Sequence, residues 1–174
     1  MINIYEPKIE SYTQSAISAI KDGWISNHGK FVDLANNKLK EVTNTKFSIL
    51  MSNGTCATHC LFLALKFKYP IINKIYVPNN CYIAAWNTSL MEYDIGQLEI
   101  MKMDENTWNI STDEEYINTL DKNSAVLIVH NLGNIINVPR LKIIRPDLIF
   151  VEDNCEGMLG KYENIYSGMS ESSL

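Results

Sequence analysis

Four segments of this 174-residue chain place small or polar residues directly after an apolar run, where they could bind a ligand. In the first segment, residues 51–59, Gly54 would let a ligand approach the backbone and Thr55 offers a hydroxyl group. The free amides of a helix that begins here would attract an anion. The segment therefore suits a phosphate group, although an ordinary helix cap would use the same residues.

Two further segments end in residues that could face a ligand or simply pack. In residues 77–87, Pro78 should end a strand, and Tyr82 just beyond it could stack on a planar ring. An ordinary packed aromatic is the alternative interpretation of Tyr82. The third segment ends in His130 and Asn131, which either face a pocket or satisfy loop backbone.

The fourth segment, residues 148–157, is an apolar run that ends in Glu152 and Asp153. A carboxylate at this position must be paired or protonated if it is desolvated. Opposite a pyridinium nitrogen, it would keep that nitrogen protonated and make the ring an electron sink. A magnesium ligand of the Walker type and a helix cap are the alternatives. The absence of G-x-x-x-x-G-K-[ST] argues against the Walker interpretation.

The elements that would position these residues alternate between strands and helices. Apolar runs without strict alternation indicate strands that are covered on both faces, and hence a mostly parallel sheet between helices. The carboxyl ends of such strands meet at one edge, so the four segments should come together there. We predict strands over 47–51, 74–77, 98–103, 125–130 and 148–152, and helices over 55–68, 82–92 and 112–120. Two helices should precede them, one from near Pro7 to Gly23 and one over 31–42, and we expect a single α/β domain over 1–174.

Composition excludes several other classes of function. The net charge is −5, with 15 basic against 20 acidic residues, which argues against nucleic-acid binding. No apolar run is long enough to span a membrane, and the first residues lack the features of a signal peptide, so we expect a cytoplasmic protein without a membrane partner. Cys56, Cys60, Cys81 and Cys155 match no metal-binding spacing. We expect buried, reduced cysteines and no metal site.

Taken together, these segments resemble the DegT/DnrJ/EryC1/StrS family of sugar aminotransferases. This family is a branch of the aspartate-aminotransferase-like, fold-type-I enzymes that use pyridoxal 5'-phosphate (PLP). The resemblance implies a truncated large domain of that fold, with a mostly parallel sheet flanked by helices and without the C-terminal small domain. The matching segments are Gly23-Trp24-Ile25-Ser26, Ser52-Asn53-Gly54-Thr55, Val77-Pro78, residues 104–110, Val129-His130 and Glu152-Asp153.

The resemblance also implies a role for individual residues. Gly54, Thr55 and the amide of Cys56 match the turn that binds the PLP phosphate. Tyr82 matches the aromatic residue that stacks on the pyridine ring. Asp153 matches the catalytic aspartate that pairs with the pyridine nitrogen, and Glu156 matches a residue beside the phenolic oxygen of the cofactor.

The activity implied is transfer of an amino group from glutamate to C4 of a dTDP- or GDP-linked 4-keto-6-deoxy sugar, by a homodimer. One departure matters, because the lysine that binds the cofactor covalently in this family should follow the Asp153 strand and has no counterpart before Leu174. Lys161 does not match it, and we expect a solvated side chain in an edge hairpin. The isolated chain should therefore lack this catalysis.

Three other interpretations stay open at this stage. The same residues occur in PLP-dependent sugar dehydratases, in which histidine replaces the lysine. The isolated chain could also be a non-catalytic binding module that retains the fold. A generic nucleotide-binding domain is disfavoured because G-x-G-x-x-G is absent.

Overall fold

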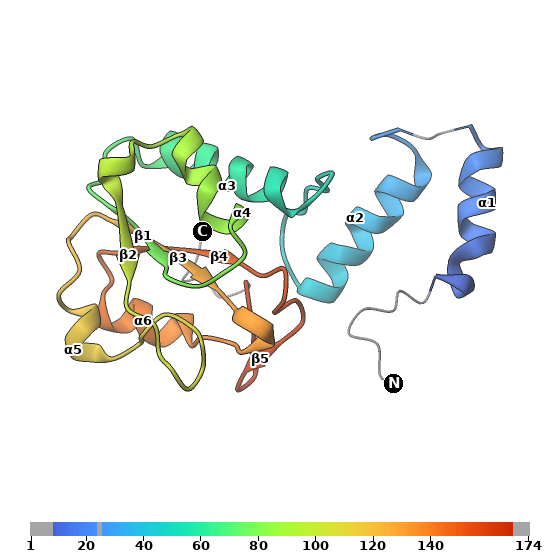
Figure 1. The fold of residues 1–174 in the computed structure, drawn as a ribbon. Coiled ribbons are helices and arrows are strands. Elements are labelled where there is room, and N and C mark those ends of the chain that lie inside the picture. Colours follow the sequence, from blue (N-terminus) through green and yellow to red (C-terminus); the bar gives the residue numbers. More distant parts are fainter. Residues whose placement is uncertain (1–8, 24–25, 169–174) are drawn as a thin grey trace. The chain divides into compact units, whose positions relative to one another are not determined.

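The computed structural model describes residues 9–23 and 26–168, which form two compact units, Met1–Leu50 and Met51–Leu174. The first contains the two predicted helices; Pro7 and the residues Trp24 and Ile25 lie outside the described residues. Its elements are η1 (Glu10–Tyr12), α1 (Thr13–Lys21) and α2 (Lys30–Thr43) (Figure 1). The single domain over 1–174 stays a prediction.

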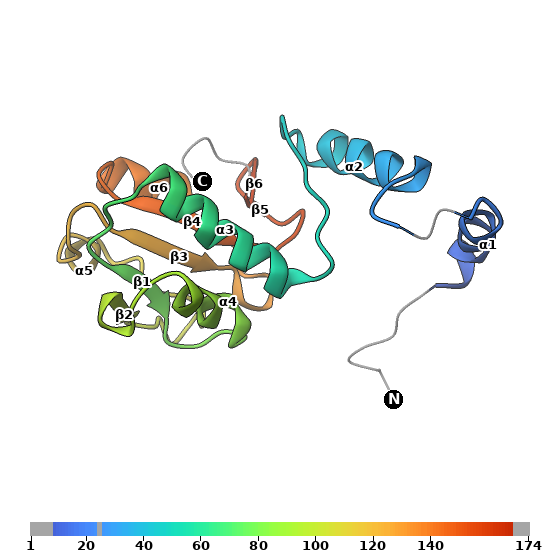
Figure 2. The same ribbon diagram turned by 90° about the horizontal axis from the view of Figure 1, so that it is seen from above.

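The second unit is built on a four-stranded parallel sheet with the order β2-β1-β3-β4, as Figures 1 and 2 show. This confirms the prediction of a mostly parallel sheet. Its strands are β1 (Ile75–Pro78), β2 (Leu98–Met101), β3 (Ala125–Val129) and β4 (Ile149–Asp153). The register of β3 with β4 places Val129 opposite Asp153, so both strands end at the same edge of the sheet.

Helices cover both faces of this sheet, which explains why the central strands β1 and β3 are buried at every position, whereas the edge strand β2 leaves Glu99 and Ile100 exposed. Figure 1 shows α3 and α4 on one face and α5 and α6 on the other. Along β3, Leu127 packs in the core under α3 and α4, whereas the next residue, Ile128, packs in the core under α5 and α6. The helices are α3 (Gly54–Lys68), α4 (Ala84–Asn87), η2 (Thr88–Met91), η3 (Ile95–Gln97), α5 (Glu114–Ile117), η4 (Asn131–Gly133) and α6 (Val138–Ile144).

The predicted strand over 47–51 is wrong. The segment has no regular secondary structure, and Phe47 and Ile49 are 76% and 75% exposed. An apolar run becomes a strand only where a neighbouring strand takes up its backbone hydrogen bonds. Within the part of the chain that the structure describes, no strand pairs with this segment.

Helix lengths differ more from expectation than strand positions do. The predicted helix over 82–92 is divided between α4 and the 3-10 helix η2, and the helix over 112–120 shortens to α5. Asp113 caps α5 by accepting a hydrogen bond from the backbone N–H of Tyr116. This cap explains why α5 begins at Glu114.

The expectation of buried cysteines is also wrong. Cys56 and Cys155 are exposed, and Cys60 and Cys81 are partly exposed; all four are free thiols. Cys56 lies in the first turn of α3 and Cys155 just after β4, so both lie at the carboxyl edge of the sheet and not in the core.

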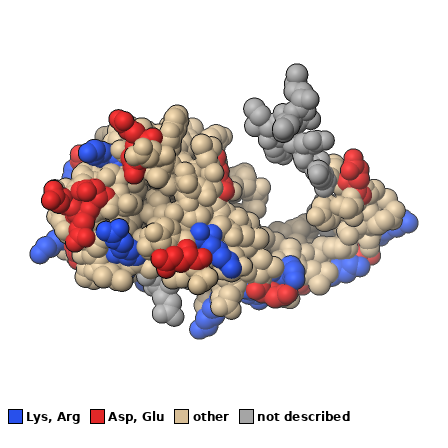
Figure 3. Space-filling view, turned by 90° about the horizontal axis from the view of Figure 1, so that it is seen from below, with Lys and Arg blue, Asp and Glu red and all other residues tan. Residues whose placement is uncertain are grey.

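The described residues contain no helix that is long and apolar enough to cross a membrane. The same residues include no group of three or more His, Cys, Asp or Glu side chains that could hold a metal ion. On the face shown in Figure 3, basic and acidic side chains lie among one another.

The end of α6 is joined to the end of α5 by Arg145, which is 7% exposed. Its guanidinium donates hydrogen bonds to the carbonyls of Ile117 and Leu120 at 2.8 and 2.9 Å and forms a 2.6 Å ion pair with Asp147. The hydrogen bond from Arg145 lowers the pKa of Asp147 below its ordinary value of 3.8.

This contact predicts a pH-dependent stability. Since the folded-state pKa of Asp147 is depressed, its contribution to stability is present above the ordinary value of 3.8 and is lost as the pH falls through the folded-state pKa. We expect Asp147→Asn to lower the unfolding free energy at neutral pH and to flatten its fall in acid. Urea unfolding between about pH 6 and pH 2 measures this. An unchanged acid dependence in the variant would contradict the assignment.

Candidate functional site

A cavity of about 400 Å³, here called the strand-end cavity, opens where β1, β3 and β4 end and α3 begins. Five of the six residues predicted to bind the cofactor line it: Gly54, Thr55, Tyr82, Asp153 and Glu156. Residues separated by about a hundred positions in the sequence therefore meet at one edge of the sheet. The position agrees with the rule that ligands bind at the carboxyl ends of parallel strands.

The turn before α3 is a capped helix start. The Asn53 side chain accepts a 2.9 Å hydrogen bond from the backbone N–H of Cys56, so the helix cap that the sequence left open is present. This bond occupies the Cys56 amide that we predicted to bind phosphate, and Cys56 is not among the cavity-lining residues. Gly54 and Thr55 occupy the first two helical positions, where amides have no acceptor within the helix.

Asp153 brings a carboxylate to the cavity from the end of β4. Its Oδ1 atom accepts a 3.1 Å hydrogen bond from the backbone N–H of Cys155. Desolvation and the nearby Asp153 charge raise the pKa of the Cys81 thiol to about 11. Desolvation is the main cause, and a hydrogen bond to Asp153 the second, that raises the pKa of the Cys155 thiol to about 11 as well. Both thiols are therefore protonated at neutral pH.

Tyr82 lies at the mouth of the cavity with 77% of its surface exposed. The ordinary packed aromatic that the sequence left open is therefore not what the structure shows. An exposed ring beside a cavity offers a flat apolar face to a ligand ring.

Glu156 lines the cavity and also holds the loop after β3. Its Oε2 atom accepts a 2.6 Å hydrogen bond from the backbone N–H of Leu132. Leu132 has a φ of 53°, which is unfavourable for a residue with a branched side chain. The hydrogen bond that Glu156 accepts helps to fix this strained residue in the loop beside Asn131, which lines the cavity.

Glu152, the neighbour of Asp153, points away from the strand-end cavity, because successive side chains of a strand lie on opposite faces. Its carboxylate lies 2.9 Å from Nε2 of His130, and the two side chains are 4% and 0% exposed. Nδ1 of His130 accepts a hydrogen bond from the backbone N–H of Ile136, so we assign the ring proton to Nε2. His130 therefore accepts a hydrogen bond from the loop backbone at Ile136 and forms a buried pair with Glu152.

Asn131 lines the cavity and connects three loops. Its side-chain amide donates to the carbonyls of Asn80 and Trp108 at 2.9 and 2.8 Å, and its backbone N–H donates to Oδ1 of Asn109. It thus ties the segments that follow β1, β2 and β3. The sequence offered a pocket or the loop backbone as alternatives for Asn131, and the residue serves both.

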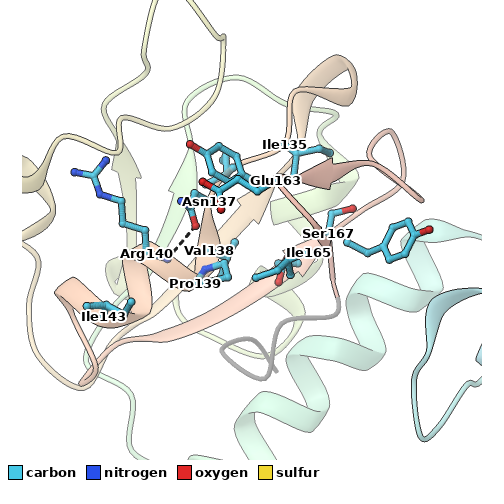
Figure 4. Close-up of a pocket in the computed structure, with 13 residues that line it drawn as sticks. Ile135, Asn137, Val138, Pro139, Arg140, Ile143, Glu163, Ile165 and Ser167 are labelled. Atoms are coloured by element: carbon cyan, nitrogen blue, oxygen red, sulfur yellow. Dashed lines mark hydrogen bonds between the residues drawn. The ribbon is translucent and has the colours of Figure 1, made fainter.

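A second cavity, of about 170 Å³, lies between the start of α6 and the hairpin of β5 (Lys161–Tyr162) and β6 (Ile165–Tyr166), and Figure 4 shows it. None of the six predicted residues lines it. The hairpin itself was predicted, and the Lys161 ammonium lies 4.2 Å from the ring centroid of Tyr166. Lys161 is exposed and does not line the strand-end cavity.

Comparison with known proteins identifies the family. The family model of the DegT/DnrJ/EryC1/StrS aminotransferases matches residues 7–172. The chain belongs to this family. It is 26% identical over 170 residues to GDP-perosamine synthase of Escherichia coli O157:H7, and this match covers 96% of the chain and 46% of the relative. It is 30% identical over 162 residues to GDP-4-keto-6-deoxy-D-mannose 3-dehydratase of Escherichia coli O55:H7, which covers 88% of the chain and 40% of that relative.

The fold agrees with that of a solved family member. The chain superposes on Escherichia coli GDP-4-keto-6-deoxy-D-mannose-3-dehydratase with bound hydrated PLP at a TM-score of 0.80 and 24% identity, over 97% of the chain and 45% of that protein. The predicted aspartate-aminotransferase-like large domain is thereby confirmed. The chain spans less than half the length of these members of the family.

Proposed function

We propose that the strand-end cavity binds PLP and that the whole protein is a PLP-dependent sugar-nucleotide aminotransferase. It transfers the amino group of glutamate to C4 of a dTDP- or GDP-linked 4-keto-6-deoxy sugar. The observation that carries this proposal is the meeting of Gly54, Thr55, Tyr82, Asp153 and Glu156 in one cavity. Similarity to GDP-perosamine synthase supports the sugar nucleotide.

The residues of the cavity fit the groups of the cofactor. The amides of Gly54 and Thr55 and the Thr55 hydroxyl would bind the phosphate, at the positive end of α3. The Asp153 carboxylate would hold the pyridine nitrogen in its protonated form, and Tyr82 would cover the ring. When bound, PLP supplies a ring that withdraws electrons from the substrate carbon. The Cys56 amide would contribute only if the Asn53 cap opened.

A sugar 3-dehydratase is the second candidate function. The dehydratase of Escherichia coli O55:H7 is 30% identical to this chain, compared with 26% for the perosamine synthase. Lysine or histidine at the position that follows the Asp153 strand would decide between them. Incubating the whole protein with PLP, glutamate and a GDP-linked 4-keto-6-deoxy sugar tests both proposals, because one yields a 4-amino sugar and the other a sugar dehydrated at C3.

For the chain itself, we predict reversible PLP binding without a covalent lysine adduct. Lys161 is exposed and is not among the residues that line the cavity, so we expect it not to take this role. Borohydride reduction followed by peptide mapping should find no stoichiometric label, and Lys161→Arg should bind PLP as the unmodified chain does. Stoichiometric labelling of Lys161 would overturn this prediction.

The oligomeric state and location are part of the proposal. We infer that the whole protein is a homodimer, as the resemblance implies, and that it works in the cytoplasm. Its partners would then be small molecules, namely the sugar nucleotide and glutamate.

A further inference from the structure

Gly54 and Cys155 lie next to each other in the wall of the strand-end cavity. Gly54 begins α3, and Cys155 follows β4 two residues after Asp153. A Cβ atom added at Gly54 would lie 3.1 Å from Sγ of Cys155, closer than ordinary van der Waals contact. Gly54 has no left-handed φ, so the limit on its side chain comes from this neighbour and not from the backbone.

Cys155 also contacts Asp153 through its main chain. Its backbone N–H donates a 3.1 Å hydrogen bond to Oδ1 of Asp153. One residue therefore touches both parts of the site, the helix start that faces the phosphate and the carboxylate that faces the ring. Although Cys155 is exposed overall, its sulfur atom lies close to the space that a side chain at Gly54 would occupy.

We propose that Cys155 is a positioning residue, which sets the distance between the phosphate-binding start of α3 and the carboxylate of Asp153. This inference rests on the proposed function. It implies that positions 54 and 155 are matched in size: with glycine at 54, a side chain as large as cysteine fits at 155. A larger side chain at either position would push the two parts of the site apart.

The matched sizes give a double-mutant test on the chain itself. We expect Gly54→Ala to weaken PLP binding about tenfold, because the new methyl group overpacks the contact. Cys155→Ala removes the sulfur, so the double variant Gly54→Ala/Cys155→Ala should recover binding to within about threefold of Cys155→Ala alone. Fluorescence titration with PLP measures each affinity.

Three further variants separate this role from a general loss of fold. Cys155→Val enlarges the other side chain of this contact, so it should weaken PLP binding as Gly54→Ala does. Cys155→Ser keeps the shape and the backbone N–H and makes the side chain slightly smaller, so it should bind PLP nearly as the unmodified chain does. Gly96→Ala is the matched control, since a Cβ atom there would meet nothing within 4 Å. The thermal midpoint of each ligand-free variant reports its folding.

Pyridoxal lacks the phosphate group, so it tests whether Gly54→Ala acts by changing the spacing between the two parts of the site. Spacing between the two parts matters only for a ligand that spans both, so Gly54→Ala should weaken PLP much more than pyridoxal. A double variant that stays as weak as Gly54→Ala, or equal losses for both ligands, would overturn the inference and leave the proposed function intact. No PLP binding by the unmodified chain would overturn both.

Discussion

Replacing Asp153 by asparagine is expected to slow the chemical step of the whole enzyme by about 3–5 kcal/mol in activation free energy while PLP stays bound. Asparagine keeps the size, and its side-chain oxygen can still accept the hydrogen bond from the backbone N–H of Cys155. It lacks the negative charge that favours a protonated pyridine nitrogen in a partly desolvated site. The ring would then stabilise negative charge on the substrate less well.

The measurement is the single-turnover rate of amino transfer from glutamate to a dTDP- or GDP-linked 4-keto-6-deoxy sugar. The cofactor content is followed by absorbance. Asp153→Glu keeps the charge and moves it by one methylene group, so it should cost less than Asp153→Asn. Wild-type turnover in the asparagine variant would remove Asp153 from the mechanism.

Replacing His130 by leucine is expected to lower the unfolding free energy by about 2–4 kcal/mol, because a hydrogen bond to a buried carboxylate and the acceptor of a buried backbone N–H are lost. The side chain of His130 is fully buried, and Glu152, its partner at 2.9 Å, is 4% exposed. Leucine fills much of the space but donates no hydrogen bond to the buried carboxylate. It also removes the acceptor of the Ile136 backbone N–H. Urea unfolding measures the loss.

The chain offers a matched control in a second histidine and glutamate pair. His59 and Glu92 lie 3.0 Å apart, but their side chains are 36% and 15% exposed. Because water reaches this pair and Glu92 keeps a 3.5 Å ion pair with Lys66 after the substitution, His59→Leu should destabilise the protein much less than His130→Leu. Equal losses in the two variants would show that burial does not set the strength of the His130 pair.

The sequence by itself determined the sheet and the segments at its edge. Its four strands were predictable because each contains a short apolar run, and the two central strands, β1 and β3, are buried at every position, which favours apolar residues on both faces. Parallel strands share one carboxyl edge, so the predicted residues around Gly54, Tyr82 and Asp153 were expected to meet there. The strand-end cavity brings them together.

Only the tertiary structure decided which polar side chains face that cavity. Glu152 and Asp153 are adjacent carboxylates, but the pleat of β4 directs one to His130 and the other to the cavity. Asn131 contacts loops that are far from it in the sequence, and Cys155 lies close to the distant Gly54. No local sequence pattern predicts such contacts. Residues 47–51 show the converse case, because an apolar run without a described partner strand remains irregular.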